Sequence, residues 1–459
     1  MTTRDPRTTD GDVRAAEDAT DQVDAGTYAP AERDSGAASL SAVPSEESEA
    51  EFRPVDAHLA MVLGAAVRPR PVRVAISESQ GLLCAEEVIA EHALPGFDQA
   101  AVDGYAVRSV DVRAATEVAP VELPVVGEIH AGSRQPRRLQ PGQAVRVATG
   151  APLPTLADAV VPTSFTDDHP ARVTISRSVP SAGYLRRTGE DVQIGDVAVR
   201  QGDIIGSAQV GLLAAVGRAK VLVYPRPRVS IVSVGDELVD VDRTPSVGQV
   251  YDVNSYALAA AARDAGAEVS RVGIVSNDPA RLREVVEGRL LMSEIVVVAG
   301  GAGGSAGDEV RAALSDLGGI DMTRVAMHPG SMQGFGKLGP DAVPTFLIPA
   351  NPMSALVVFE VMVRPLIRAA RGSRNPYRRV VSARLLAPIT STQGRKGFLR
   401  GQLLRDESNG EYLVQPLGTS GSHLLASLAE ANCLITVGEM LTEVAAGEQV
   451  QVAFLAQRG

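Results

Sequence analysis

The sequence contains no tryptophan, 3% aromatic residues and only two cysteines in 459 positions. So few aromatic rings argue against a stacking platform for bases or sugars. Cys84 and Cys433 lie too far apart for a zinc motif, and two cysteines make no disulfide framework. No run of eighteen apolar residues is present, and the N-terminus lacks the apolar core of a signal peptide. We therefore expect a cytoplasmic protein with no direct membrane insertion.

Basic residues are also too few for a nucleic-acid partner, because 44 Lys and Arg face 55 Asp and Glu and leave a formal net charge of -11. The acidic excess is uneven. Residues 1–55 contain thirteen acidic and five basic side chains, and the remainder is close to balance. Segment 1–54 also has few large apolar side chains, so we predict a disordered acidic tail there.

The remaining chain predicts several domains. Residues 105–186 are short alternating segments separated by Gly and Pro, which indicates a small β insertion domain. The flanking segments 55–104 and 187–225 are expected to form a linker or first module. That module should begin with one helix in AHLAMVLGAAV and continue with a second helical run after Ser77. Residues 374–459 return to short strands and predict a C-terminal β domain of barrel-like form.

Residues 226–373 show the clearest periodicity, since apolar strands alternate with amphipathic helices. This alternation predicts a parallel sheet covered by helices on both faces. Asn254 and Asp278 are placed to cap helices, and Gly266 and Gly372 are placed to end them. The predicted fold class is therefore multi-domain α/β plus β.

Ligands of open parallel sheets bind beyond the carboxyl ends of the strands. Five predicted strand ends carry polar or glycine residues, and these are Asp236-Glu237, Asn277-Asp278, the loop 300–305 leading to Asp308, His328 to Ser331, and Asn351 with Ser354. Glycine-rich turns that open helices favour phosphate. Carboxylates beside a phosphate require a hard cation such as Mg²⁺ between them. This rim therefore predicts a site for a nucleotide or phosphorylated cofactor with Mg²⁺.

Each feature also has a structural interpretation. Asp278 can serve only as a helix cap, and the glycine loop matches neither G-x-G-x-x-G nor a Walker motif. Asp236-Glu237 can decorate a surface turn, His328 can be an ordinary loop histidine, and Asp103 can belong to a β-turn. The coincidence of five such strand ends favours the site hypothesis.

Six motifs in order resemble the MoeA/gephyrin E-domain family of molybdopterin molybdenumtransferases. They are PGFDQAAVDGYAVR at 95–108, TGAPLP at 149–154, RRTGED at 186–191, SVGDEL at 233–238, GQVYDVN at 248–254 and IPANPMSA at 348–355. The resemblance covers about residues 54 to 459. It implies a homodimer of four-domain subunits, with the active cleft between the α/β domain of one subunit and the first modules of its partner.

The same resemblance implies a reaction, in which molybdate is inserted into adenylylated molybdopterin with Mg²⁺ and AMP is released. By motif position it implies catalytic roles for Asp103, Asp278 and Asp308, and metal binding by Asp191, Asp236 and Glu237. Binding of molybdopterin-AMP is implied for a further set, namely Thr149, Gly300, Gly301, Gly303, His328, Ser331, Asn351 and Ser354.

The departures from the family pattern concern the anion site. Where the family has K-P-G-K, this chain has His328-Pro329-Gly330-Ser331, so two permanent cations become a mostly neutral histidine and a hydroxyl. Such a site attracts a dianion less strongly. The departures therefore leave open whether the protein is an active enzyme, an impaired one, a sensor that binds a pterin or nucleotide without turnover, or a non-catalytic gephyrin-like scaffold. The scaffold would bind a peptide of a membrane or cytoskeletal partner.

Overall fold

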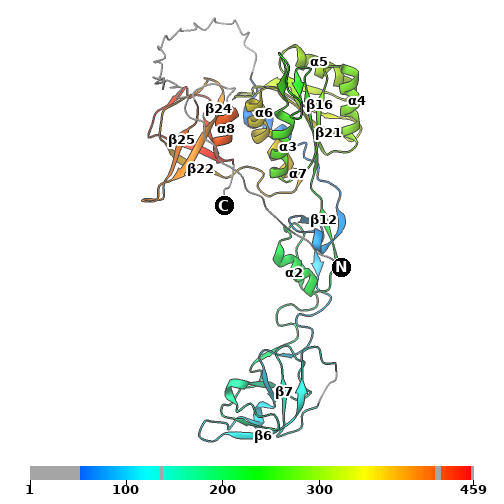
Figure 1. Ribbon diagram of the computed structural model, residues 1–459, viewed down its shortest axis with the longest axis vertical. Coiled ribbons are helices and arrows are strands. Elements are labelled where there is room, and N and C mark those ends of the chain that lie inside the picture. Colours follow the sequence, from blue (N-terminus) through cyan, green and yellow to red (C-terminus); the bar gives the residue numbers. More distant parts are fainter. Residues whose placement is uncertain (1–51, 135–137, 419–424, 456–459) are drawn as a thin grey trace, which may run out of the picture. The chain divides into compact units, whose positions relative to one another are not determined.

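The computed structural model describes residues 52–134, 138–418 and 425–455 (Figure 1). The predicted acidic tail lies outside these residues except for its last three positions. The described residues build an α/β domain, a small β domain and a closed C-terminal barrel, so the predicted fold class is confirmed. Within the described ranges, no helix combines the length and apolar character needed to cross a membrane.

The α/β domain contains a six-stranded sheet in the order β16-β13-β17-β21-β20-β18. Its strands are β13 (Arg228–Val234), β16 (Glu268–Val275), β17 (Ile295–Ala302), β18 (Ile320–Arg324), β20 (Met332–Leu338) and β21 (Val343–Pro349). Strands β16, β13, β17 and β21 are mutually parallel, whereas β20 is antiparallel to both of its neighbours. The sequence pattern had not predicted β20, and its two glycines, Gly334 and Gly336, explain why.

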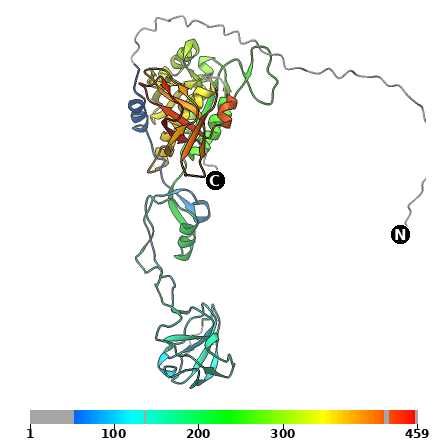
Figure 2. The same cartoon turned by 90° about the vertical axis from the view of Figure 1, so that its left-hand side faces the viewer.

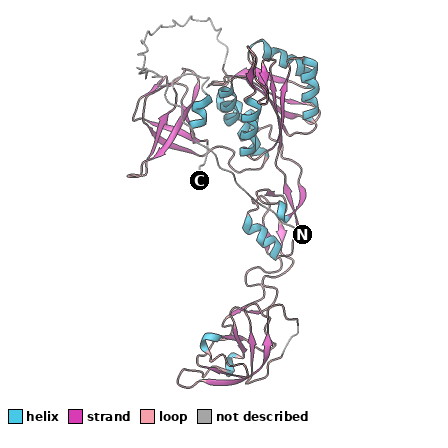
Figure 3. Ribbon diagram, in the orientation of Figure 1, coloured by secondary structure: helices cyan, strands magenta, loops and turns pink. Residues whose placement is uncertain are grey.

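Helices cover both faces of this sheet (Figure 3). They are α3 (Asn254–Ala265), α4 (Pro279–Leu290), α5 (Gly304–Leu314), η4 (Ser315–Leu317), α6 (Pro352–Val358), the π-helical turn η5 (Phe359–Val363) and α7 (Arg364–Ala370). In β17, Ile295 and Val297 pack with α3, α6 and α7, while Val296 and Val298 pack with α4 and α5. The two-residue period thus buries both faces of one strand, which accounts for its continuous apolar sequence.

The observed helix starts and ends agree with the predicted capping residues except at Asn254. Asp278 caps α4, and Gly266 ends α3 with φ of 96°. Asn254 had been predicted to cap α3, but it is the first helical residue, and Val253 precedes it. The nearby Asp252 accepts the backbone N–H of Ser255 instead, at 3.0 Å. The prediction at Asn254 was wrong because Asp and Asn two residues apart compete for the same role.

The first module begins with the predicted helix α1 (Val55–Leu63). The second predicted helix, after Ser77, does not form, and that segment contains η1 (Ile76–Glu78), β2 (Leu83–Cys84) and β3 (Val88–Ile89). Their partners are distant in sequence, because β2 pairs with β12 (Lys220–Tyr224) and β3 with β11 (Val197–Val199). This long-range pairing overrides the local helical pattern. The module also contains β1 (Val72–Ala75), β4 (Gln99–Ala100), β10 (Leu185–Arg186) and α2 (Ser207–Ala215).

Two β structures complete the chain. The first is a five-stranded sheet of β8 (Ala159–Pro162), β5 (Gly104–Val107), β7 (Ala144–Val147), β6 (Val121–Ile129) and β9 (Arg172–Ile175), with η2 (Ser109–Asp111) and η3 (Thr163–Phe165). The second is a barrel of β24 (Lys396–Arg405), β25 (Tyr412–Pro416), β22 (Val380–Leu385), β28 (Gln449–Phe454) and β26 (Cys433–Val437), closed by pairing of β24 with β26. Figure 2 looks onto its crossing strands, drawn orange to red. It also carries β23 (Ile389–Thr390), β27 (Glu443–Val444) and α8 (Leu425–Glu430).

Candidate functional site

The order of the α/β sheet reverses between β13 and β17. Strand β13 leads to α3 on one face, and β17 leads to α5 on the other. Such a switch point opens a crevice at the carboxyl ends of the strands. A cavity of about 270 Å³ lies there, which we call the switch-point crevice. It is lined by Val234, Glu237, Leu238, Val250, Tyr251, Asp252, Val253, Asn254, Ala299, Gly300, Ala350 and Pro352. These include β14 (Leu238–Val239) and β15 (Val250–Tyr251), a short parallel pair.

Gly300 is required where β17 meets β13. Its φ is +92°, and an added Cβ would collide with the carbonyl oxygen of Val234. Of the other predicted loop glycines, Gly301 faces the side chain of Leu347, and Gly303 precedes α5 with φ of 95°. The glycines therefore serve a tight strand-to-helix turn at the crevice.

The predicted acidic residues of the α/β domain have different surroundings. Glu237 lines the crevice, and the neighbouring Asp236 accepts the backbone N–H of Asn277 at 3.1 Å. Asp278 accepts the N–H of Ala280 at 3.1 Å as the cap of α4. Asp308 is the fifth residue of α5 and is 75% exposed, with a carboxylate oxygen 3.6 Å from Arg311. Of these four residues, only Glu237 lines the crevice, and Asp236 precedes it in the chain.

The side chains near the crevice determine how Mg²⁺ could be bound there. Within the described ranges, no group of three or more His, Cys, Asp or Glu side chains is arranged to hold a metal ion. Mg²⁺ is commonly bound by one or two carboxylates together with substrate phosphates. Asp236 and Glu237 fit such a shared site, and they do not form a closed site made of protein ligands alone.

Three predicted site residues belong to the first modules. Asp103 and Thr149 are bonded to each other, and Asp191 lies apart from them. The carboxylate of Asp103 accepts the N–H and the hydroxyl of Thr149 at 2.6 and 2.7 Å, and these bonds hold the pKa of Asp103 below its usual range. Asp191 is exposed, and its backbone N–H binds the carbonyl of Leu94. Their predicted role opposite another subunit's crevice stays a prediction.

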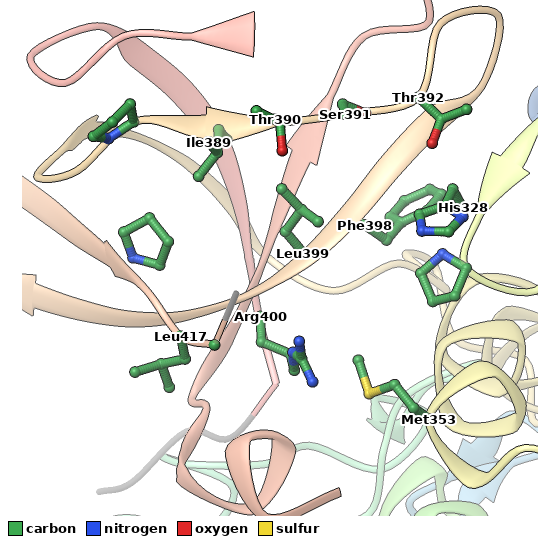
Figure 4. Close-up of a pocket in the computed structure, with 14 residues that line it drawn as sticks. His328, Met353, Ile389, Thr390, Ser391, Thr392, Phe398, Leu399, Arg400 and Leu417 are labelled. Carbon is green, nitrogen blue, oxygen red and sulfur yellow. The ribbon is translucent and has the colours of Figure 1, made fainter. Parts of the chain in front are cut away.

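A second cavity, of about 380 Å³, lies against the barrel (Figure 4). We call it the barrel pocket, and it is lined by His328, Pro329, Met353, Pro388, Ile389, Thr390, Ser391, Thr392, Phe398, Leu399, Arg400, Pro416, Leu417 and Gly418. His328 belongs to β19 (Met327–His328), which pairs with β24 of the barrel. His328 therefore lines a different cavity from Glu237. The two cavities share no lining residue, although Pro352 of the first and Met353 of the second are consecutive residues of α6.

The charge of the barrel pocket comes from a residue that sequence reasoning missed. Arg400 extends from β24 into the pocket and is 7% exposed (Figure 4). Burial lowers the pKa of Arg400, but a guanidinium stays charged at neutral pH. Burial, and then the nearby charge of Arg395, lower the pKa of His328. His328 is therefore neutral near pH 7, and Arg400 supplies a permanent cation.

Hydroxyl and amide groups around the barrel pocket divide into two kinds. Ser331 donates its hydroxyl to the carbonyl of Val325 at 2.8 Å, and Asn351 caps α6 by accepting the N–H groups of Met353 and Ser354. Those predicted binding residues thus stabilise local structure. Ser391 differs, since its buried Oγ has no hydrogen-bond partner among the described residues. Its side chain lines the pocket, and its Oγ lies close to Gly397.

Family models match nearly the whole described chain. The MoeA N-terminal region (domain I and II) matches residues 53–217, a probable molybdopterin binding domain matches 230–369, and the MoeA C-terminal region (domain IV) matches 382–455. Together with the crevice, these matches define a multi-domain protein of the molybdopterin-binding class.

The similarity extends to whole proteins. Molybdopterin molybdenumtransferase 1 of Mycobacterium tuberculosis is 63% identical over 426 residues, which cover 89% of this chain and 100% of that relative. The molybdopterin molybdenumtransferase of Haemophilus influenzae is 32% identical over 82% of this chain and 92% of its own. A crystal structure of the molybdopterin biosynthesis MoeA protein from Pyrococcus horikosii matches with a TM-score of 0.76 at 30% identity, covering 89% and 100% of the two chains. The chain belongs to the MoeA family.

Proposed function

We propose that this protein is an active molybdopterin molybdenumtransferase of molybdenum cofactor biosynthesis. In the proposed reaction, molybdate is inserted into adenylylated molybdopterin, the phosphoanhydride bond to AMP breaks, and AMP is released. The relatives are named for this activity, and the similarity covers most of their length. The two cavities would provide one place for the organic substrate and one for an oxyanion.

The observation that carries this proposal is the position of Arg400. The absence of the two family lysines had left the attraction of molybdate in doubt, since His328 is neutral and Ser331 binds Val325. Arg400 lines the same pocket as His328 and restores a fixed positive charge in a mostly buried setting. A planar guanidinium is well suited to oxyanions, and a buried charge acts more strongly than an exposed one.

Asp236 and Glu237 would hold Mg²⁺ in this proposal, and the ion would neutralise phosphate charge beside the carboxylates. We also propose a cytoplasmic homodimer, in which Asp103, Thr149 and Asp191 of one subunit face the crevice of the other. The alternative of a gephyrin-like scaffold holding a membrane or cytoskeletal peptide is not favoured, because the relatives are named as transferases.

Genetic complementation tests the proposal. The native chain is expressed in a bacterial strain that lacks its own molybdopterin molybdenumtransferase, and the activity of a molybdenum-dependent reductase is measured. We expect the activity to return to most of the parental value. A soluble, well-expressed chain that leaves the reductase inactive would contradict the proposal.

A further inference from the structure

Asn254 has a buried acceptor that the fold leaves unused. The residue lines the switch-point crevice and is 8% exposed. Its Nδ2 donates to the carbonyl oxygen of Ala350 at 2.7 Å. Its Oδ1 is buried and has no hydrogen-bond partner within the described ranges. Because a rotated amide would set two acceptor oxygens against each other, the bond to Ala350 fixes Oδ1 as the unpaired atom.

The neighbouring Asp252 shows that the unpaired atom is a local exception. Asp252 is 1% exposed, and its carboxylate accepts the hydroxyl of Ser233, the hydroxyl of Ser255 and the backbone N–H of Ser255. The polar groups around the start of α3 are therefore well satisfied, apart from Oδ1 of Asn254. A buried acceptor without a donor costs free energy, and native proteins keep such an atom where a ligand or an ordered water supplies the donor.

The crevice lining indicates what kind of ligand would supply that donor. Most of the wall is apolar, including Val234, Leu238 and Pro352, and its carboxylates come from Glu237 and Asp252. No Lys or Arg is among the described residues that line it. Acceptors without cations disfavour a phosphate group and favour a flat ring that carries N–H donors. The volume of about 270 Å³ accommodates a bicyclic ring.

We propose that Asn254 is a specificity-determining residue of this crevice, where its Oδ1 accepts a hydrogen bond from the exocyclic amino group of an aminopyrimidine edge. The inference rests on the proposed function, because adenylylated molybdopterin carries such an edge on both its pterin and its adenine. In this arrangement the ring occupies the crevice, and the phosphates lie outside it.

Equilibrium binding to the full chain tests the assignment with two pairs of probes. Pterin is compared with lumazine, and AMP is compared with IMP, since each second member has an oxo group in place of the amino group. One pair should show the amino compound binding about ten-fold more tightly, which is about 1.4 kcal/mol. The pair that shows the preference identifies which ring enters the crevice.

Variants assign the preference to a residue. Asn254→Ala should reduce the ratio of the two dissociation constants to about one. Val250→Ala, which alters the apolar wall, should weaken both members of a pair equally and leave the ratio unchanged. If Asn254→Ala does not fold, the ratios of the native chain still test whether the crevice prefers an amino group, and ratios near one still overturn the proposal.

A ratio below two for both pairs on the native chain overturns the proposal, and it points to an ordered water on Oδ1. Absence of binding by all four probes overturns it as well. A ratio that persists in folded Asn254→Ala assigns the preference to another residue. These outcomes are separate from complementation, because restored reductase activity with no amino preference retains the function and rejects only the role of Asn254.

Discussion

The switch-point crevice and the barrel pocket each take one lining residue from α6, yet the chain builds them in different ways. The crevice gathers the ends of neighbouring strands β13 and β17, and its residues follow from the alternation of strands and helices. The barrel pocket joins His328 of the α/β domain to Arg400 of the barrel. One cavity is thus a property of a sheet, and the other is a property of the contact between two folded units.

The chemical difference follows the structural one. The described lining of the crevice offers carboxylates and acceptors, whereas that of the barrel pocket offers a buried guanidinium and hydroxyl groups. An organic ring with N–H donors suits the first cavity, and an oxyanion suits the second. In the proposed function, the two substrates would occupy separate cavities, and Arg400 would take the place of the two family lysines.

Substitution of Arg400 should have the largest effect on turnover, because it removes the charge that distinguishes the barrel pocket from the crevice. Arg400→Ala removes the fixed cation of the barrel pocket, so turnover at limiting molybdate should fall about 100- to 1000-fold, as for loss of one oxyanion donor. Arg384→Ala is the matched control, since Arg384 is a barrel arginine outside the lining and pairs with Glu411 at 2.8 Å. Steady-state kinetics at varied molybdate measures both. Equal losses in the two folded variants would place the anion elsewhere.

The backbone at the crevice should be sensitive at Gly300. Gly300→Ala combines a positive φ with a collision against Val234, so the free energy of unfolding should fall by about 3 kcal/mol. Gly304 also has a positive φ, of 65°, but open space around it, so Gly304→Ala should cost about 1 kcal/mol. Denaturant titration compares them. A smaller loss at Gly300 than at Gly304 would show that β13 and β17 can separate without cost.

The carboxylate of Glu237 should determine how the turnover rate depends on the Mg²⁺ concentration. Glu237→Gln keeps the shape of the side chain and removes its charge, so the Mg²⁺ concentration for half-maximal activity should rise roughly ten- to 100-fold. Asp242→Asn changes an exposed carboxylate of the same loop and should have no such effect. Magnesium titration of the turnover rate decides. An unchanged midpoint in Glu237→Gln would remove this residue from the metal site.

A smaller effect, an increase in the affinity for molybdate, is expected from a substitution at His328. His328→Lys returns one family cation, and the half-saturating molybdate concentration at pH 7.5 should fall about ten-fold. Burial holds the pKa of His328 below 6.5, so the native protein gains the extra charge only as the pH falls below that value. Native affinity should therefore stay nearly constant from pH 8 to pH 6.5 and increase only at lower pH, whereas the lysine variant should vary less. A native profile as flat as that of the variant would contradict the involvement of His328.

Sequence reasoning succeeded where the period of apolar residues is local. The two-face burial of β17 and the cap at Asp278 follow from neighbouring residues alone. It failed where partners come from far along the chain. Strands β2 and β3 were taken for a helix because β12 and β11 lie more than 100 residues away. Strand β20 was missed because it contains Gly336, where a Cβ would collide with the backbone of Gly319, the residue directly before β18.

The candidate site divides in the same way. Glu237 and Gly300 lie at the crevice because strand ends converge there by topology. Arg400 gave a weak signal, since it is one of three cationic residues in β24, and only closure of the barrel against β19 shows that it accompanies His328. Asn254 was predicted as a cap, and its unpaired oxygen becomes evident only from the bond to Ala350.

The central claim is that Arg400 keeps this chain active despite the missing lysines. The most direct measurement is the release of AMP from adenylylated molybdopterin by the purified native protein, given Mg²⁺ with and without molybdate. We expect stoichiometric AMP release that depends on molybdate and is strongly reduced in Arg400→Ala. Release by the native protein no faster than in a protein-free mixture would contradict it.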